Sequence, residues 1–313
     1  MAVYLVTGGG GFIGSSIATE LLKAGERVRI LDDFSTGRRS NLEDLPGKVE
    51  LFEGPLQDAA LTARALEGVS VVFHQAAIPS VARSVSNPQE SMSANVMGTT
   101  ALIDLARHAG VKRMVFAASS SAYGQTKQLP KVETMFPEPL SPYAVAKLAC
   151  EQMLRVASSL YGIETLSLRY FNVFGPKQDP TSQYAAVVPN FITAALEGTR
   201  PQVFGDGEQT RDFCYIDNTV RANLLAANSE KKLSGEVVNV ACGERISLNQ
   251  LLALIGAEAG IQLEADYHPT RAGDVRDSLA DISRAKELIG YEPLVKVSEG
   301  IKRTFAAFAA RAR

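Results

Sequence analysis

Three glycines near the start of the chain constrain its fold more than any other feature. Gly8, Gly11 and Gly14 follow a short apolar run, residues 3–7, and open a segment with helical spacing, residues 13–24. Glycine permits a tight turn at the first position, close approach of a ligand at the second and close helix packing at the third. The free N–H groups of the helix N-terminus then face an anion. A flexible turn is the simpler alternative, but this position between a strand and a helix favours a site for the pyrophosphate of a dinucleotide.

The alternation of short and long apolar patterns continues through the first half of the chain. Further β-branched runs occur at residues 27–31, 49–53, 71–75, 113–119 and 165–169. Helical patterns lie between them, so the predicted fold class is α/β, a doubly wound parallel sheet of the Rossmann type. After residue 169, loops rich in glycine and proline replace this pattern. We therefore expect a dinucleotide-binding domain over residues 1–170 and a smaller α/β substrate lobe over residues 171–313. Some segments of that lobe return to the first domain, and a cleft separates the two.

Composition excludes several other classes. The 32 basic and 34 acidic residues nearly cancel, and no basic run is long enough to follow nucleic-acid phosphates. The first apolar run is too short to span a membrane or to serve as a secretion signal. Cys150, Cys214 and Cys242 are widely spaced and form no metal-binding pattern. We expect a soluble, cytoplasmic protein with no nucleic-acid partner, no membrane partner and no metal.

The second strand ends at an acidic residue, Asp32. It lies about 20 residues beyond the glycine loop, where a carboxylate accepts hydrogen bonds from an adenosine ribose and repels a 2′-phosphate. The predicted cofactor is therefore NAD rather than NADP. Arg38 and Arg39 follow shortly and could pair with such a phosphate, although a surface or substrate-side role explains them as well.

Tyr143 and Lys147 are four residues apart in a segment with helical spacing, residues 141–160, so both side chains lie on one face. An ammonium near a phenol stabilises the phenolate, and we expect it to lower the pKa of Tyr143, as a bound nicotinamide cation also would. Tyr143 then becomes a general base. The same spacing occurs by chance in amphipathic helices, so further features have to support it.

Those features stand at the end of the fifth strand. Ser119, Ser120 and Ser121 close it at the carboxyl edge of the sheet, where ligands of doubly wound proteins bind. A serine there can bridge Tyr143 and a substrate hydroxyl, whereas serines at strand ends also form turns. Together with Tyr143 and Lys147, the serines predict a catalytic set.

In this order, the glycines, Asp32, the serines, Tyr143 and Lys147 resemble an extended short-chain dehydrogenase/reductase that acts on nucleotide sugars. The similarity covers nearly the whole chain and is strongest to UDP-hexose 4-epimerases, most closely the UDP-N-acetylglucosamine 4-epimerases. The stretches that carry it are LSPYAVAKL, LRYFNVFGPKQDP, FGDGEQTRDFCYI and GDVRDSLADIS. The resemblance implies NAD as the cofactor and a UDP-sugar as the substrate. It also implies a homodimer joined through a four-helix bundle of the helices near residues 94–109 and 141–160.

The resemblance also implies roles for individual residues. Tyr143 is the base, Lys147 is its electrostatic partner and anchors the nicotinamide ribose, and Ser119 or Ser120 relays the proton. The implied cofactor contacts are Gly8, Gly11, Phe12, Ile13, Gly14, Asp32, Asp33, Ser35, Thr36, Gly37, Leu56, Gln75, Ala76, Ala77, Asn95, Tyr143, Lys147 and Tyr170. The implied substrate contacts are Ser80, Ser121, Asn172, Gln178, Ala186, Val187, Val203, Phe204, Arg211, Arg271, Asp274 and Ser278.

Two positions bear on specificity, and a third feature departs from the family pattern. Ser278 aligns with the position whose size gates bulky 2-substituents in this family, and a small serine should admit an acetamido group. Gln178 could donate a hydrogen bond to the acetyl carbonyl. Gly54 and Pro55 depart from the family, because many relatives carry an acidic residue there that accepts from the adenine amino group. The backbone of Leu56 is then the contact expected near the adenine.

The catalytic set predicts inversion at C4 through a transient 4-keto sugar. Tyr143 removes the C4 hydroxyl proton, directly or through a serine, while C4 passes hydride to NAD. The sugar then turns about its diphosphate anchor and recovers the hydride on its other face. UDP-N-acetylglucosamine and UDP-N-acetylgalactosamine are the expected pair, with UDP-glucose and UDP-galactose as further substrates.

Other activities are weighed against this one. An NDP-sugar 4,6-dehydratase is disfavoured because Ser120, Ser121 and Ala122 stand where its acid and base are expected. A UDP-uronic acid 4-epimerase or decarboxylase stays open, since Arg83 or Arg38 could meet a carboxylate. A non-catalytic NAD-binding module is least favoured because the tyrosine, the lysine and the serines are all retained.

Overall fold

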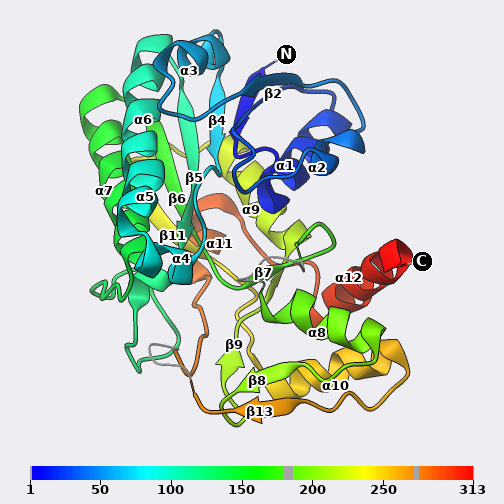
Figure 1. Ribbon diagram of the computed structural model, residues 1–313. Coiled ribbons are helices and arrows are strands. Elements are labelled where there is room, and N and C mark those ends of the chain that lie inside the picture. Colours follow the sequence, from blue (N-terminus) through cyan, green and yellow to red (C-terminus); the bar gives the residue numbers. More distant parts are fainter. Residues whose placement is uncertain (1, 180–185, 271–274, 313) are drawn as a thin grey trace.

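A seven-stranded parallel sheet forms the centre of the computed structural model (Figure 1). The structure describes residues 2–179, 186–270 and 275–312. In spatial order the strands are β3 (Glu50–Glu53), β2 (Arg27–Asp32), β1 (Val3–Thr7), β4 (Val71–His74), β5 (Arg113–Ser119), β6 (Glu164–Tyr170) and β11 (Glu236–Val240). The order reverses between β1 and β4, as a doubly wound fold requires. The fold class predicted from the alternating pattern is confirmed.

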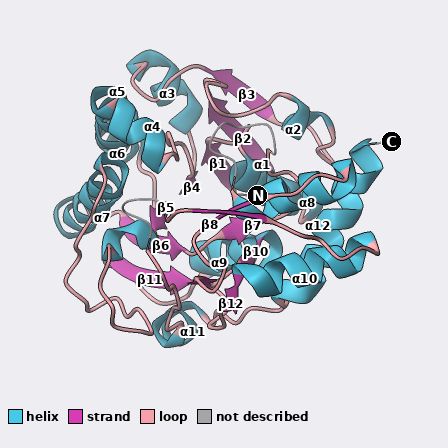
Figure 2. Cartoon of the chain, turned by 60° about the horizontal axis from the view of Figure 1, so that its bottom comes forward, coloured by secondary structure: helices cyan, strands magenta, loops and turns pink. Residues whose placement is uncertain are grey.

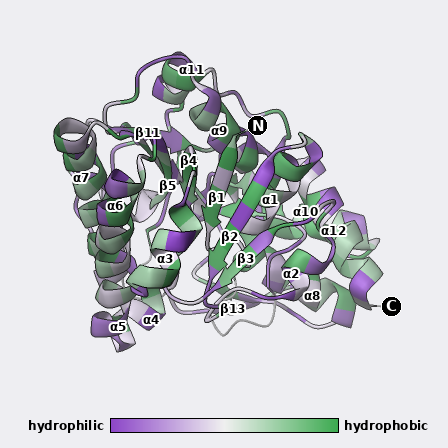
Figure 3. Cartoon of the chain, turned by 90° about the horizontal axis from the view of Figure 1, so that it is seen from above, coloured by the Kyte–Doolittle hydropathy of each residue, from purple (hydrophilic) through white to green (hydrophobic). Residues whose placement is uncertain are grey.

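Helices cover both faces of the sheet, because successive residues of each strand point to opposite sides. Tyr4 and Val6 of β1 belong to one buried cluster and Leu5 to another. The first cluster includes apolar residues of α1 (Phe12–Lys23), α9 (Ile216–Asn228) and α11 (Ser283–Ile289), and the second those of α3 (Ala59–Leu66), α6 (Gly98–Ala109) and α7 (Pro142–Tyr161). Figure 3 shows α6 and α7 on the side of the sheet opposite α1 and α9. The short helices are α2 (Ser40–Glu43), α4 (Val81–Ser86), α5 (Pro88–Met92) and the 3₁₀ turn η2 (Ser120–Tyr123).

The helix predicted over residues 94–109 is not uniform. A π-helical turn, η1 (Ser93–Met97), precedes α6. The Asn95 carbonyl accepts hydrogen bonds from Thr99 Oγ1 at 2.6 Å and from Cys150 Sγ at 3.3 Å. These side-chain donors add to a backbone hydrogen bond from the Gly98 N–H to the same carbonyl. Such turns often occur near functional sites.

A second region follows β6 and lies beside the carboxyl edge of the sheet (Figure 2). Its elements are β7 (Val173–Phe174), α8 (Val187–Glu197), β8 (Gln202–Phe204), β9 (Thr210–Arg211), β10 (Cys214–Tyr215), β12 (Ile246–Ser247), α10 (Leu248–Ala259), β13 (Asp266–His268) and α12 (Val297–Ala312). The short strands pair as β7 with β10, β8 with β13 and β9 with β12. Between these segments the chain returns to the central sheet, where β11 pairs with β6.

Among the described residues, no helix is long and apolar enough to cross a membrane, and no three metal-binding side chains are grouped to hold an ion. Cys150, Cys214 and Cys242 are free thiols, and the first two are buried.

Candidate active site

A cavity of about 1380 Å³ runs along the carboxyl edge of the sheet and reaches into the second region. On the cofactor side its predicted lining residues are Gly8, Phe12, Ile13, Gly14, Asp32, Asp33, Ser35, Thr36, Leu56, Gln75, Ala76, Ala77, Tyr143, Lys147 and Tyr170. On the substrate side they are Ser80, Ser119, Ser120, Ser121, Asn172, Gln178, Ala186, Arg211 and Ser278. The structure therefore brings together residues that are up to 270 positions apart, Gly8 and Ser278.

Several predicted contacts lie elsewhere. Gly11 and Gly37 do not line this cavity, although Gly37 is packed against Gly10. Val203 is 1% exposed and belongs to the hydrophobic core rather than to the cavity wall. Arg271 and Asp274 lie outside the described residues.

The glycine loop fits a dinucleotide because it leaves no room for side chains. Gly8 has a φ of 67°, and a Cβ there would lie 2.6 Å from the Ala76 backbone nitrogen. A Cβ at Gly14 would lie 2.2 Å from the Gly8 carbonyl oxygen. Both positions therefore require glycine, and the N-terminus of α1 stays open to an anion.

Asp32 is held rigidly at the end of β2. Its Oδ2 accepts from the Gly10 N–H at 2.8 Å, and its Oδ1 accepts from the Phe34 N–H at 2.7 Å. Burial raises the pKa of the carboxyl, and the two backbone hydrogen bonds oppose that rise. Each oxygen keeps a further lone pair, which is what two ribose hydroxyls would need.

A row of hydrogen-bonded polar side chains fixes the loop after β4. Sequence reasoning did not single these residues out. The His74 ring is fully buried and hydrogen-bonds Thr7 Oγ1 and Thr99 Oγ1, each at 2.8 Å. Burial, and secondarily the charge of Lys147, lower the pKa of His74 to about 3, so the ring is neutral. Thr7 Oγ1 in turn accepts from the Ala76 N–H at 3.3 Å.

Asn95 supports the same loop instead of lining the cavity. Its Oδ1 accepts from the Ile78 N–H at 2.8 Å, and its Nδ2 donates to the Ile78 carbonyl at 3.3 Å. The side chain is 2% exposed. Asn95 therefore positions the backbone that follows Gln75, Ala76 and Ala77.

Local capping places Tyr143 at the start of α7. The Ser141 hydroxyl accepts from the Ala144 N–H at 3.2 Å, and Pro142 occupies the first helical position, where its missing N–H costs nothing. The Tyr143 N–H donates to Ser84 Oγ of α4 at 3.1 Å. The helix start is thus tied to α4, and both elements line the cavity.

The electrostatics of Tyr143 differ from our expectation. Burial raises the pKa of Tyr143 to about 12, and a hydrogen bond with Ser119 opposes the rise only in part. Lys147 donates from Nζ to the Ala117 carbonyl at 2.7 Å and lies 6.0 Å from the centre of the Tyr143 ring. Burial lowers the pKa of Lys147 to about 8. The predicted lowering of the Tyr143 pKa is wrong for the protein alone, because desolvation of the phenol outweighs the opposing effect of Ser119.

The three serines have different surroundings. The Ser119 side chain lowers the pKa of Tyr143, and its Oγ accepts from the Ser121 N–H at 3.2 Å and from Ser121 Oγ at 2.8 Å. Ser119 thus caps the 3₁₀ turn η2 that follows the strand, as turn-forming serines do. Ser120 also lines the cavity.

Tyr170 and Gln75 meet at a third residue, Asn223 of α9, which sequence reasoning also missed. The Tyr170 hydroxyl accepts from Asn223 Nδ2 at 2.8 Å and donates to Gln75 Oε1 at 3.2 Å. Gln75 Nε2 donates to Asn223 Oδ1 at 3.2 Å. These hydrogen bonds orient Tyr170 and Gln75, the two predicted cofactor contacts, from the face of the sheet that α9 covers.

A second cavity of about 560 Å³ lies in the second region. Its lining includes Val187 and Phe204, and it shares Asn172, Ala186 and Arg211 with the first cavity. The Phe204 ring stacks on His268 with a centroid distance of 5.3 Å. Arg211 donates from Nη1 to the carbonyls of Thr210 and Arg276, each at 2.9 Å. An aromatic ring in the second cavity and an arginine at the junction of the two cavities suit a nucleobase and its diphosphate.

The specificity positions also line the large cavity. The Ser278 N–H donates to the Thr210 carbonyl at 3.1 Å, which holds the backbone in place. The small side chain of Ser278 lines the cavity. Gln178 Nε2 donates to the Val173 carbonyl at 3.3 Å. One of its amide hydrogens is therefore already used within the protein.

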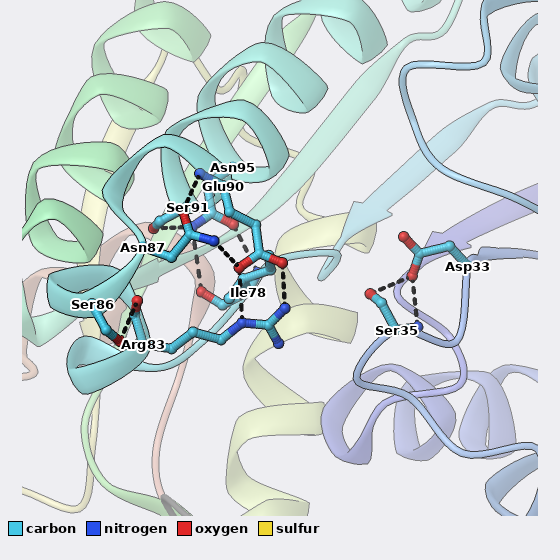
Figure 4. A network of polar contacts seen from close by, with 9 residues as sticks. All are labelled: Asp33, Ser35, Ile78, Arg83, Ser86, Asn87, Glu90, Ser91 and Asn95. Carbon is cyan, nitrogen blue, oxygen red and sulfur yellow. Dashed lines mark hydrogen bonds and ion pairs between the residues drawn. The ribbon is translucent and has the colours of Figure 1, made fainter.

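Both arginines considered for a uronic acid have carboxylate partners. Arg83 of α4 pairs with Glu90 of α5, through Nε to Oε2 at 3.1 Å and through Nη2 to Oε1 (Figure 4). Arg38 pairs with Asp179. Lys177 and Asp179, which sequence reasoning did not single out, line the same cavity.

A doubly wound sheet with a glycine loop, a fixed acidic residue after β2 and a Ser/Tyr/Lys set defines a dinucleotide-dependent enzyme of the α/β class. The model of the NAD dependent epimerase/dehydratase family matches residues 4–241. The chain belongs to this family, which confirms the predicted resemblance and the dependence on NAD.

Individual relatives act on different UDP-sugars. The UDP-glucose 4-epimerase of Mycolicibacterium smegmatis is 39% identical over 308 residues, 97% of each chain. The UDP-glucuronate 4-epimerase of Thermodesulfobacterium geofontis is 35% identical over 97% of this chain and 95% of that protein. The structure of the UDP-N-acetylglucosamine 4-epimerase from Methanobrevibacter ruminantium in complex with UDP-N-acetylmuramic acid has a TM-score of 0.94, with 36% identity over 99% of both chains. The names of these relatives agree on 4-epimerisation of a UDP-sugar and differ in the sugar.

Proposed function

We propose that this protein inverts C4 of UDP-N-acetylglucosamine and UDP-N-acetylgalactosamine, and more slowly of UDP-glucose and UDP-galactose. One observation carries the proposal. Ser119, Tyr143 and Lys147 line the same cavity as the glycine loop and Asp32, and the Ser119 side chain acts to lower the pKa of Tyr143. A hydroxyl relay, a phenol and an ammonium beside a dinucleotide site form the set needed to remove and return a hydroxyl proton.

In this proposal Tyr143 accepts the proton of the C4 hydroxyl, through Ser119 or directly, and later returns it. The cavity residues on the cofactor side would hold NAD, which would supply the acceptor and donor of the C4 hydride. Lys147, held against the Ala117 carbonyl, keeps a positive charge near the phenol and lies where it can bind a ribose hydroxyl. The protein's own contribution is thus proton transfer and orientation.

The second cavity supplies the anchor for the nucleotide part. Phe204 and Val187 would contact the uracil, and Arg211 at the junction would bind the diphosphate. The hexose then lies in the larger cavity and has room to turn over between the two hydride transfers. Binding energy concentrated on the nucleotide is compatible with a sugar that has to move.

The choice of sugar follows from two features of the wall. Ser278 is small and leaves space for an acetamido group. Arg83 and Arg38 are each already paired with a carboxylate, so the carboxylate of a UDP-uronic acid would have to displace Glu90 or Asp179. This arrangement favours a neutral hexose over a uronic acid.

We also propose the division of the chain at residue 170 and a homodimer. Residues 1–170 carry the cofactor contacts, and residues 171–313 carry the nucleotide anchor, apart from segments such as β11 that return to the sheet. Apolar side chains of η1 and α7 are exposed, among them Met97 at 59% and Leu160 at 69%. A second copy packed on this surface would bury them.

The test follows the anomeric sugar signals by proton NMR. The purified protein is incubated with UDP-N-acetylglucosamine, UDP-glucose and UDP-glucuronic acid in separate samples, without added cofactor and then with added NAD. We expect the galacto epimer of the acetylated sugar to form fastest. Faster conversion of UDP-glucuronic acid, or loss of CO₂ from it, would establish the uronic-acid alternative. Absence of any epimer with added NAD would contradict the proposed function.

A further inference from the structure

A short segment of the second region, residues 175–179, begins against the first residues of α1 and α9. Gly175 packs on Phe12, the first residue of α1, so closely that a Cβ would lie 3.2 Å from the Phe12 ring. Arg311 of α12 donates from Nη1 to the Pro176 carbonyl at 2.7 Å. The start of the segment is therefore fixed on both sides.

Two polar contacts then fasten the segment to the loop after β2. Lys177 Nζ donates to the Asn41 carbonyl at 3.2 Å, and Asp179 forms an ion pair with Arg38. Both partners are tied in turn to Gly10 of the glycine loop. Asn41 Nδ2 donates to the Gly10 carbonyl at 2.8 Å, and the Arg38 N–H donates to the same oxygen at 2.9 Å.

These contacts complete a ring around one end of the large cavity. Arg38, Asn41, Lys177 and Asp179 all line it, together with Gly8 and the residues that follow Asp32. The ring runs from the glycine loop through residues 38–41, across to residues 177–179, and back through Gly175 and Phe12. It joins the two regions of the chain at the end of the cavity where the pyrophosphate site was predicted.

We propose that the contacts Lys177 to Asn41 and Arg38 to Asp179 form a strap that slows the release of NAD. The inference rests on the proposed function, in which the cofactor is restored in every turnover and has no need to leave. An exposed ion pair is weak, so loss of one contact is expected to accelerate release by about two- to five-fold. Salt should weaken the Arg38 to Asp179 contact and accelerate release in the same direction.

The experiment measures NAD release directly. Wild-type protein and the variants Asp179→Asn and Lys177→Met are loaded with NAD, freed of excess cofactor and diluted. The NAD that remains bound is quantified over time after rapid gel filtration and acid extraction. We expect faster release from both variants. High salt should accelerate release from wild type and from Lys177→Met, which keeps the ion pair, and have a smaller effect on Asp179→Asn.

Glu53→Gln is the matched control. It breaks the ion pair between Arg39 and Glu53, which involves the same loop but residues that do not line the cavity. Release from this variant should equal that from wild type. Equal release from wild type, Asp179→Asn and Lys177→Met, or equal acceleration by Glu53→Gln, would overturn the strap. Product analysis with the wild-type protein tests the proposed function separately, because epimer formation and the release rate are measured independently.

Discussion

Burial shifts the pKa values of Tyr143 and Lys147 in opposite directions. The phenol pKa rises to about 12 and the ammonium pKa falls to about 8, because burial disfavours the charged form of each group. Tyr143 is therefore a neutral phenol in the protein without cofactor. The positive charge of a bound nicotinamide would favour the phenolate, so we expect proton removal to depend on cofactor binding.

Replacement of Tyr143 by phenylalanine removes the hydroxyl and keeps the ring. We expect kcat to fall by about 10² to 10⁴, the usual contribution of a general base, while UDP binding is unchanged. NMR turnover assays and calorimetric UDP titration measure the two effects. Tyr161→Phe, an exposed tyrosine at the end of the same helix, should behave as wild type. Normal turnover in Tyr143→Phe would remove Tyr143 from the mechanism.

The pH dependence of activity should report Lys147. Its ammonium is present below a pKa of about 8 and is lost as the pH rises through that value. We expect kcat/KM to decline above about pH 8, and this limb to be absent from the residual activity of Lys147→Met.

The lowered pKa of Lys147 affects the stability of the protein in the opposite direction. The unfolded chain keeps the lysine pKa near 10.5 and binds more protons between the two values, so this group alone makes unfolding less favourable as pH rises.

At the scale of elements, a buried ion pair fixes helix α7, which carries Tyr143 and Lys147, to the sheet. Glu151 lies one turn beyond Lys147 and receives two hydrogen bonds from Arg169 of β6, at 2.9 and 2.8 Å. The side chains are 0% and 3% exposed. The guanidinium also lies 4.6 Å from the centre of the Tyr123 ring. The position of Lys147 therefore depends on contacts at the next turn of the helix.

Glu151→Gln should destabilise the protein strongly, because Arg169 would remain buried without its carboxylate. A loss of about 3 to 5 kcal/mol in the free energy of unfolding is typical for such a change. Urea unfolding followed by circular dichroism measures it. Glu20→Gln, which breaks the exposed pair with Lys23, is the control and should change stability little. A Glu151→Met/Arg169→Met double variant should recover part of the loss. A Glu151→Gln variant as stable as wild type would contradict this account.

The elements and the residues that line the cavity at the strand ends were predictable because their signals are local. Strand and helix patterns alternate, and Gly8, Asp32 and Ser119 stand at the carboxyl ends of parallel strands, which meet at one edge. The supporting contacts were not predictable in this way. Asn223 lies 148 residues from Gln75, and no periodicity links the two. The sign of the Tyr143 pKa shift was also missed, because spacing predicts a neighbour but not the degree of desolvation.

At the scale of the molecule, the exposed apolar residues of η1 and α7 form the surface proposed for the dimer. Val145, Val156 and Leu160 of α7 are 43%, 45% and 69% exposed, and their spacing places them along one side of the helix. Figure 1 shows α7 at the outer side of the sheet, away from the second region. A partner on this side would leave the cavity open.

Charged substitutions on this surface should separate the subunits. Met97→Glu/Leu160→Glu is expected to shift the mass measured by light scattering from dimer to monomer, because two carboxylates would be buried in the interface. Leu294→Glu, which changes a side chain that is 68% exposed outside these helices, should remain dimeric. A monomeric wild-type protein would rule out the dimer.

The return of β11 to the sheet also affects how the chain folds during synthesis. β6 is complete at residue 170, but the strand that pairs with it ends only at residue 240. Until that strand has left the ribosome, the backbone groups on one side of β6 have no partner and present an open edge to other nascent chains. The dinucleotide-binding half therefore cannot finish folding before much of the other half has been translated, and a fragment cut at residue 170 should aggregate.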